Sequence, residues 1–130
     1  MRGGQSLAEA LERHLADWSE QTGVTVETWA LPITDVPARV SEGVLTAMRE
    51  ALSNVELHSG ARTVSIAVTT GRSGLRMTVS DNGRGFAADA VPGRGIARMR
   101  AAFAEIGGSL AVNSVPGEGT TVSGVVPRRR

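Results

Sequence analysis

The strand patterns of this sequence arrive in adjacent pairs, and this order constrains the fold more than any other feature. Helical patterns over 7–21, 38–58 and 96–106 separate a single strand pattern over 24–29 from two later strand pairs. Strands joined by short turns pair antiparallel, whereas a parallel pair needs a long crossover. We therefore predict an α/β chain of the α+β type, a two-layer sandwich whose mixed, mostly antiparallel sheet carries helices on one face. The paired strands are indicated by alternating apolar residues: Val64, Ile66 and Val68 with Leu75, Met77 and Val79, then Leu110 and Val112 with residues 120–126.

Local signals predict where the helices begin and end. Ser6 and Glu9 have the spacing of a capping box before the first helix. Pro37 is expected in the opening turn of the long helix over 38–58, and Gly60 is expected to close it. The pair Gly107-Gly108 is typical of a helix C-cap and predicts the end of the third helix.

Length and composition narrow the classes of protein. A chain of 130 residues fits one domain over 1–130, and we expect an ordered core over about 6–126 with an arginine-rich tail over 127–130. The absence of cysteine excludes disulfides, thiolate metal sites and a cysteine nucleophile. The apolar stretches are too short for a membrane-spanning helix, so we expect a soluble, cytoplasmic chain. With only 3% aromatic residues, we expect no nucleic-acid partner.

Three polar residues on the long helix are spaced so that they lie along one stripe. Glu50, Asn54 and His58 follow one another at intervals of four, which places a carboxylate, an amide and an imidazole in line. Such a stripe either lines a site or is a solvated helix face. Periodicity by itself leaves both interpretations open.

Three glycine-containing segments stand at the ends of predicted elements. Residues 81–86, with the sequence Asp-Asn-Gly-Arg-Gly-Phe, follow a strand directly, where glycine allows positive φ and close approach of a ligand. Residues 93–95, Gly-Arg-Gly, precede the third helix, whose N-terminus favours an anion. Residues 117–121, Gly-Glu-Gly-Thr-Thr, enter the last strand. Each segment alone is also compatible with an ordinary turn or cap, and a lysine-containing phosphate loop is excluded because the chain has no lysine.

Taken in order, these segments resemble the motifs of the GHKL ATPase superfamily. Residues 50–55 with His58 look like its N box, 81–86 like its G1 box, 93–99 like its G2 box and 117–121 like its final glycine and threonine motif. The short link over 86–93 and the Gly-x-Gly-Ile-x-x-Met form of the G2 box resemble the ATP-binding catalytic domain of bacterial two-component sensor histidine kinases, in the branch that feeds NarL-type response regulators. The resemblance covers about residues 6–126 and implies the GHKL ATPase fold.

The resemblance implies an enzyme, an ATP-dependent protein histidine kinase, with ATP and Mg²⁺ as cofactors. Glu50 matches the N-box acid and is the expected catalytic residue, and Asn54 matches the amide that binds Mg²⁺. Asp81 matches the carboxylate that accepts a hydrogen bond from the adenine amino group. The remaining residues expected to bind ATP are His58, Gly83, Gly85, Gly93, Gly95, Ile96, at the start of a helix that offers its N-terminus to phosphate, and Thr120.

Two departures from the family pattern bear on function. Leu57 stands where many members carry a basic residue that holds phosphate, so Arg84, Arg94 or Arg98 are candidates to replace it. His14 lacks the acidic neighbour of a phosphoacceptor histidine, so we expect the dimerisation and phosphoacceptor domain to lie outside these residues. The expected partners are ATP, that domain of the parent kinase and, indirectly, a response regulator.

Further expectations and alternatives follow from the same resemblance. We expect this domain to be a monomer and the parent kinase a homodimer, which could itself be anchored in the membrane. An anti-sigma-factor-type protein serine kinase shares the superfamily and is an alternative enzyme. A protein-interaction module with a degenerate nucleotide site is a second alternative, which the leucine at position 57 leaves open.

Overall fold

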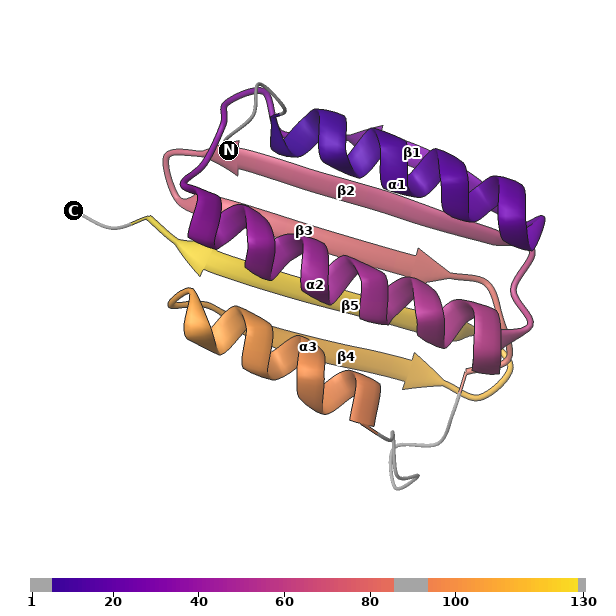
Figure 1. Cartoon of the computed structure of the whole chain (residues 1–130). Coiled ribbons are helices and arrows are strands. Elements are labelled where there is room, and N and C mark those ends of the chain that lie inside the picture. Colours follow the sequence, from indigo (N-terminus) through magenta and orange to yellow (C-terminus); the bar gives the residue numbers. More distant parts are fainter. Residues whose placement is uncertain (1–5, 86–93, 129–130) are drawn as a thin grey trace.

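Three helices cover one face of a five-stranded sheet in the computed structural model, which describes residues 6–85 and 94–128 (Figure 1). The predicted two-layer sandwich is thereby confirmed. The elements in chain order are α1 (Leu7–Thr22), β1 (Thr25–Ala30), α2 (Ala38–Asn54), the π-helical turn η1 (Val55–Ser59), β2 (Thr63–Gly71), β3 (Gly74–Asp81), α3 (Arg94–Glu105), β4 (Ser109–Val115) and β5 (Gly119–Pro127).

The strands lie in the order β1-β2-β3-β5-β4, so β1 and β4 form the two edges. Only the β1–β2 pair is parallel, and α2 supplies the crossover that a parallel pair requires. The β2–β3, β3–β5 and β4–β5 pairs are antiparallel. The prediction of a mixed, mostly antiparallel sheet is therefore confirmed.

The hydrophobic core lies between the sheet and the helices. Alternate residues of β2 and β3 are buried, and the register places Ile66 opposite Val79 and Val68 opposite Met77 in rows that face the helices. From the helix layer, Leu11, Met48, Met99 and Phe103 are fully buried, and the Phe103 ring lies against Gly124 of β5. The alternation read from the sequence thus corresponds to a sheet with one buried face.

Helix ends agree with the local sequence signals, with one displacement. The Ser6 Oγ accepts a hydrogen bond from the Glu9 backbone N–H at 3.2 Å, and the Glu9 carboxylate accepts one from the Ser6 N–H at 2.9 Å, which completes the predicted capping box. Pro37 is the N-cap of α2 and thus precedes the opening turn in which it was expected.

The long helix predicted over 38–58 changes its character within that range. The α-helical part ends at Asn54, and one π-helical turn continues to Ser59 before Gly60 closes it at φ 66°. Such π turns often occur at functional sites because they widen the helix locally and redirect its side chains. None of the described helices has the length and apolar character needed to cross a membrane.

Candidate functional site

Four segments converge at one end of the molecule. The last residue of β3, the C-terminal part of α2 with η1, the N-terminus of α3 and the β4–β5 turn all lie at the same end of the sandwich (Figure 1). Each of these four segments carries one of the four motifs that the sequence analysis identified. The fold therefore brings motifs from distant parts of the chain to one place.

Asp81 is the final residue of β3 and is half-buried. Its Oδ1 accepts a hydrogen bond from the Gly83 backbone N–H at 2.8 Å, which fixes the orientation of the carboxylate. The register places Asp81 opposite Val64 and Thr120, and Val64 is buried beneath the helices. Because directly opposed residues share a face, Asp81 and Thr120 both belong to the helix-facing side of the sheet.

Thr120 stands at the start of β5 and is held by its neighbour on β4. Its Oγ1 lies 2.7 Å from the Ser114 Oγ. The preceding residue, Gly119, has φ 98°, and a methyl group there would lie 2.1 Å from the Asp81 carbonyl oxygen. Only glycine therefore allows the β4–β5 turn to approach the end of β3 this closely.

Asn82 of the Asp-Asn-Gly sequence has a role that the sequence analysis missed. Its Oδ1 accepts hydrogen bonds from the backbone N–H groups of Arg62 and Thr63, each at 3.2 Å. The amide thus ties the exit of β3 to the entry of β2. Asparagine commonly bonds to nearby backbone in turns, but a partner some twenty positions away in sequence has no local signature.

The loop after Asp81 is laid against the β4–β5 turn. Gly85 has φ 65°, and a methyl group on it would lie 2.3 Å from the Val115 carbonyl oxygen. The Gly117 N–H donates to the Arg84 carbonyl oxygen at 2.6 Å. The backbone of the G1-like segment is therefore held in place by glycines on both sides. Gly83 is buried, and its N–H is already used by Asp81.

Asn54 and Gly95 come together across the two helices. Asn54 is the last α-helical residue of α2, and Gly95 is the second residue of α3. A methyl group on Gly95 would lie 2.9 Å from the Asn54 Oδ1 and 3.3 Å from its Nδ2. The missing side chain at Gly95 leaves the amide accessible beside the N-terminus of α3.

Glu50 lies one turn before Asn54 and is paired with a residue of α3. Its Oε1 lies 3.3 Å from the Arg98 Nη1, and the two side chains are 23% and 60% exposed respectively. The expected catalytic carboxylate is therefore oriented by an arginine. The sequence analysis proposed Arg98 only as a phosphate ligand, because its contact with Glu50 depends on how α2 and α3 pack.

The remaining expected residues are placed as follows. The backbone of His58 belongs to η1, whereas its side chain lies outside the described part of the structure, as does the whole of Gly93. Ile96 is 3% exposed in the core, so only its backbone is in a position to face a ligand. Leu57 is 68% exposed, and the Arg84 guanidinium lies over Gly60 at the end of η1.

The donor set suits a magnesium ion that is held mainly by phosphate and water. Within residues 6–85 and 94–128, no three acidic or histidine side chains gather into a metal-binding group. Mg²⁺ usually keeps several waters and takes only one or two protein ligands beside substrate phosphates. The Asn54 amide oxygen, with the space that Gly95 leaves beside it, fits this mode of binding.

Comparisons with known proteins show the family of this chain. Residues 39–130 match the family model described as "Histidine kinase-, DNA gyrase B-, and HSP90-like ATPase". The chain is 35% identical over 126 residues to the sensor histidine kinase LiaS of Bacillus subtilis, covering 95% of this chain and 35% of LiaS. It is 34% identical over 128 residues to the sensor histidine kinase MctS of Rhizobium johnstonii, covering 94% of this chain and 28% of MctS.

A solved structure shares the fold. The histidine kinase domain of the blue-light activated histidine kinase EL346 from Erythrobacter litoralis superposes with a TM-score of 0.82 at 25% identity, covering 94% of this chain and 61% of that one. The chain spans about a third of the length of the curated relatives it matches. The similarity therefore concerns one part of those longer proteins.

Proposed function

The chain belongs to the family of histidine kinase-, DNA gyrase B- and HSP90-like ATPases, and from this premise we propose that it is the catalytic domain of a bacterial sensor histidine kinase that transfers the γ-phosphoryl group of Mg²⁺-ATP to a histidine of a dimerisation domain. The observation that carries the proposal is the contact between Asn54 and Gly95. It joins the N-box-like and G2-like segments at the end of the sheet where Asp81 and Thr120 lie.

Adenine recognition falls to the end of β3. Asp81 offers a half-buried, acceptor-only carboxylate whose Oδ1 is fixed by Gly83, and an exocyclic amino group is a matching donor. Thr120 adds a hydroxyl on the same face of the sheet. The close backbone approach permitted by Gly85 and Gly119 brings the β4–β5 turn against the end of β3.

In this proposal phosphate and metal bind where the C-terminal end of α2 meets the N-terminus of α3. The N-terminus of α3 presents unpaired backbone N–H groups and the positive end of the helix dipole. Arg94 begins that helix and is exposed, and Arg98 follows one turn later. Asn54 would hold Mg²⁺ through its amide oxygen, and the bound ion would neutralise charge on the phosphates. These groups offset the loss of a basic residue at position 57.

Glu50 is the residue closest in character to a general base or a polarising carboxylate. The Arg98 Nη1 lies 3.3 Å from its Oε1, so the carboxylate is directed toward α3. In this proposal Glu50 orients the incoming imidazole, and Arg98 is a positioning residue. Phosphoryl transfer depends mostly on such positioning and charge neutralisation, because the protein does little covalent chemistry.

Calorimetric titration with ATP, with and without Mg²⁺, tests the nucleotide site. We expect the unsubstituted chain to bind Mg²⁺-ATP, Asp81→Asn to lose binding and Asn54→Ala to lose the dependence on Mg²⁺. Asp17→Asn on the exposed surface of α1 and Asn113→Ala on β4 are matched controls that should bind ATP as the unsubstituted chain does. If the folded, unsubstituted chain did not bind ATP, the result would instead favour a degenerate module that acts through protein contacts.

Phosphoryl transfer is tested separately by supplying the dimerisation domain of the parent kinase in trans. We expect transfer of the γ-phosphoryl group to its histidine nitrogen, with ADP released, and a loss of transfer in Glu50→Gln with ATP binding retained. Transfer to a serine of a separate protein would favour the anti-sigma-factor-type kinase. The short link and the G2-like sequence support the branch that feeds NarL-type response regulators.

A further inference from the structure

The hydrophobic layer is incomplete at the β1 edge of the sheet. Val26 pairs with Val64 and Thr28 pairs with Ile66, so each pair forms a row that faces the helices. Val64 and Ile66 are fully buried, whereas Val26 is only half-buried and Thr28 is exposed. The sandwich therefore opens where α1 meets β1, at the edge of the sheet farthest from β4.

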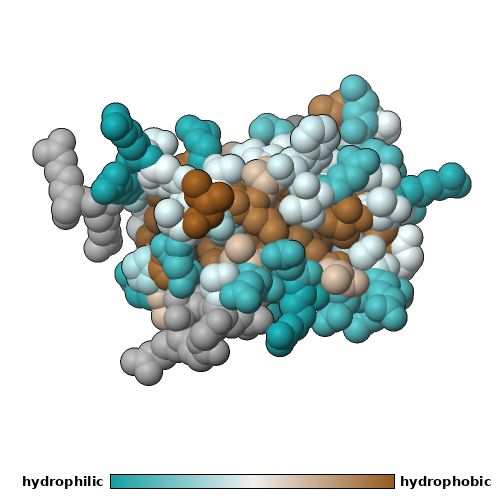
Figure 2. Space-filling model, turned by 90° about the horizontal axis from the view of Figure 1, so that it is seen from above, coloured by the Kyte–Doolittle hydropathy of each residue, from teal (hydrophilic) through white to brown (hydrophobic). Residues whose placement is uncertain are grey.

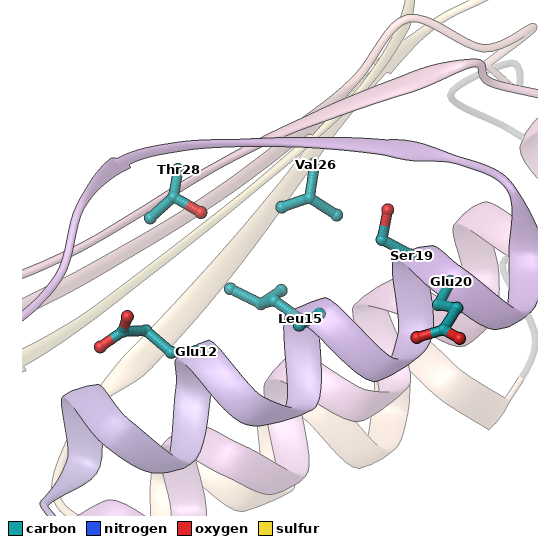
Figure 3. Close-up of a pocket in the computed structure, with 7 residues that line it drawn as sticks. Glu12, Leu15, Ser19, Glu20, Val26 and Thr28 are labelled. Atoms are coloured by element: carbon teal, nitrogen blue, oxygen red, sulfur yellow. The ribbon is translucent and has the colours of Figure 1, made fainter.

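A groove of about 460 Å³ runs along this opening. Figure 3 shows Leu15 pointing from α1 toward Val26 of β1, with Thr28 beside it, while the Ser19, Glu12 and Glu20 side chains flank the space. Figure 2 looks down on the same edge and shows a band of apolar atoms between more hydrophilic rims. The floor is apolar because Leu15 and Val26 belong to the edge of the core.

The charge of the groove has one sign. Glu12 and Glu20 stand along its α1 wall, and neither arginine nor histidine is among its lining residues. The Ser19 hydroxyl already donates to the Val24 carbonyl oxygen at 2.6 Å, so it contributes little free hydrogen-bonding capacity. An apolar floor with acidic rims complements a segment in which basic side chains flank an apolar one.

The backbone of β1 is a second recognition element. Within the described residues β1 pairs with β2 alone, which leaves its outer N–H and C=O groups facing away from the sheet. A bulge between Thr28 and Ala30 interrupts the register at Trp29, and that side chain is 74% exposed. The regular part of the open edge is therefore short, from Thr25 to Thr28.

We propose that the α1–β1 groove is a docking site for an extended, basic polypeptide segment that adds to β1 as a sixth strand. Side chains of an added strand alternate between the two faces of the sheet, so every second one would enter the groove over Leu15 and Val26. Arginine or lysine two positions before and two positions after an apolar groove-facing residue would share its face and lie beside Glu12 and Glu20. Two large apolar side chains are exposed in the same part of the chain, Trp29 near the end of β1 and, after the strand, Ile33, which is 91% exposed.

Titration of the isotope-labelled protein with a synthetic peptide, acetyl-Ser-Arg-Thr-Val-Thr-Arg-Ser-amide, whose two arginines and valine share one face of an extended strand, tests this site by NMR. We expect saturable shift changes in the backbone amides of β1 and of the groove-facing part of α1. A peptide with glutamate in place of both arginines should leave these signals unchanged. The absence of changes along β1, or equal changes with both peptides, would overturn the proposal.

Charge variants give the second measurement. Glu12→Gln combined with Glu20→Gln should lower the affinity for the basic peptide by about five- to tenfold, since each ion pair at the rim contributes modestly. Glu42→Gln combined with Glu118→Gln removes two exposed carboxylates elsewhere and should leave the affinity unchanged. A peptide-free protein that dimerises through β1, seen by sedimentation and by the same NMR signals, would show that a second copy occupies the edge and would refute the proposed occupant.

Discussion

Replacing Gly95 with alanine separates the stability of this domain from its proposed metal site. The new methyl group would lie 2.9 Å from the Asn54 Oδ1, about 0.5 Å closer than ordinary contact at 3.4 Å. Gly95 is not at positive φ, so its backbone conformation suits alanine. The Asn54 amide, as the end of a side chain, can turn away from the methyl group and relieve the contact.

The two consequences have opposite signs. Alanine has a higher helix propensity than glycine, so the free energy of unfolding should stay the same or rise by up to about 1 kcal/mol. Displacement of the Asn54 oxygen should lower the affinity for Mg²⁺-ATP by about tenfold, which corresponds to about 1.4 kcal/mol of binding free energy. Urea unfolding measures the first quantity and isothermal titration calorimetry measures the second.

Gly71→Ala is the matched control, because a methyl group at Gly71 meets no atom within 4 Å. It should leave both the affinity for Mg²⁺-ATP and the free energy of unfolding close to those of the unsubstituted chain. The reasoning would be refuted if the folded Gly95→Ala protein bound Mg²⁺-ATP with an affinity within about twofold of that of the unsubstituted chain. In that case Asn54 would not be the metal ligand, and the contact with Gly95 would serve packing only.

Three further experiments test separate parts of the structure. Gly119→Ala should lower the free energy of unfolding by at least about 2 kcal/mol, because its φ is 98° and its methyl group would meet the Asp81 carbonyl oxygen at 2.1 Å; a smaller loss in urea unfolding would contradict the described turn. Arg98→Met and Glu50→Gln, combined in a double-mutant cycle, should couple by less than about 1 kcal/mol because the pair is partly exposed, and stronger coupling would indicate a structural role for the pair. Burial, and then the charge of Arg49, lowers the pKa of His14, so the folded state binds protons less readily than the unfolded chain and stability should fall as the pH drops below about 6.5. His14→Gln should reduce that slope between pH 7.5 and 5.5, and an unchanged slope would assign it to other groups.

Much of the fold follows from local patterns. The capping box at Ser6, the left-handed glycine at position 60 and the alternation along β2 and β3 each depend on residues within a few positions of one another. Adjacent strand pairs connected by short turns leave few topologies, so the mixed sheet could be predicted as well. The pattern also placed Asp81 and Thr120 at strand ends, whereas their expected role in binding ATP came from the resemblance to the GHKL motifs.

The contacts that define the candidate site could not be predicted in this way. The pairing of Glu50 with Arg98 and the approach of Gly95 to Asn54 depend on the packing of α2 against α3. The π turn after Asn54 had no signal in the apolar periodicity, because Val55 continues the same buried face. Asn82 was interpreted as a turn residue, whereas its amide binds the backbone at the start of β2.

The sequence by itself determined the elements, their order and the residue types that stand at their ends. The tertiary structure alone decided which of those residues meet, where the core remains open at β1, and which groups are left to bind a partner. The physical reason is the range of the interactions. Caps, turns and periodicity depend on neighbouring residues, whereas the distance between two side chains on different helices depends on how the whole core is packed.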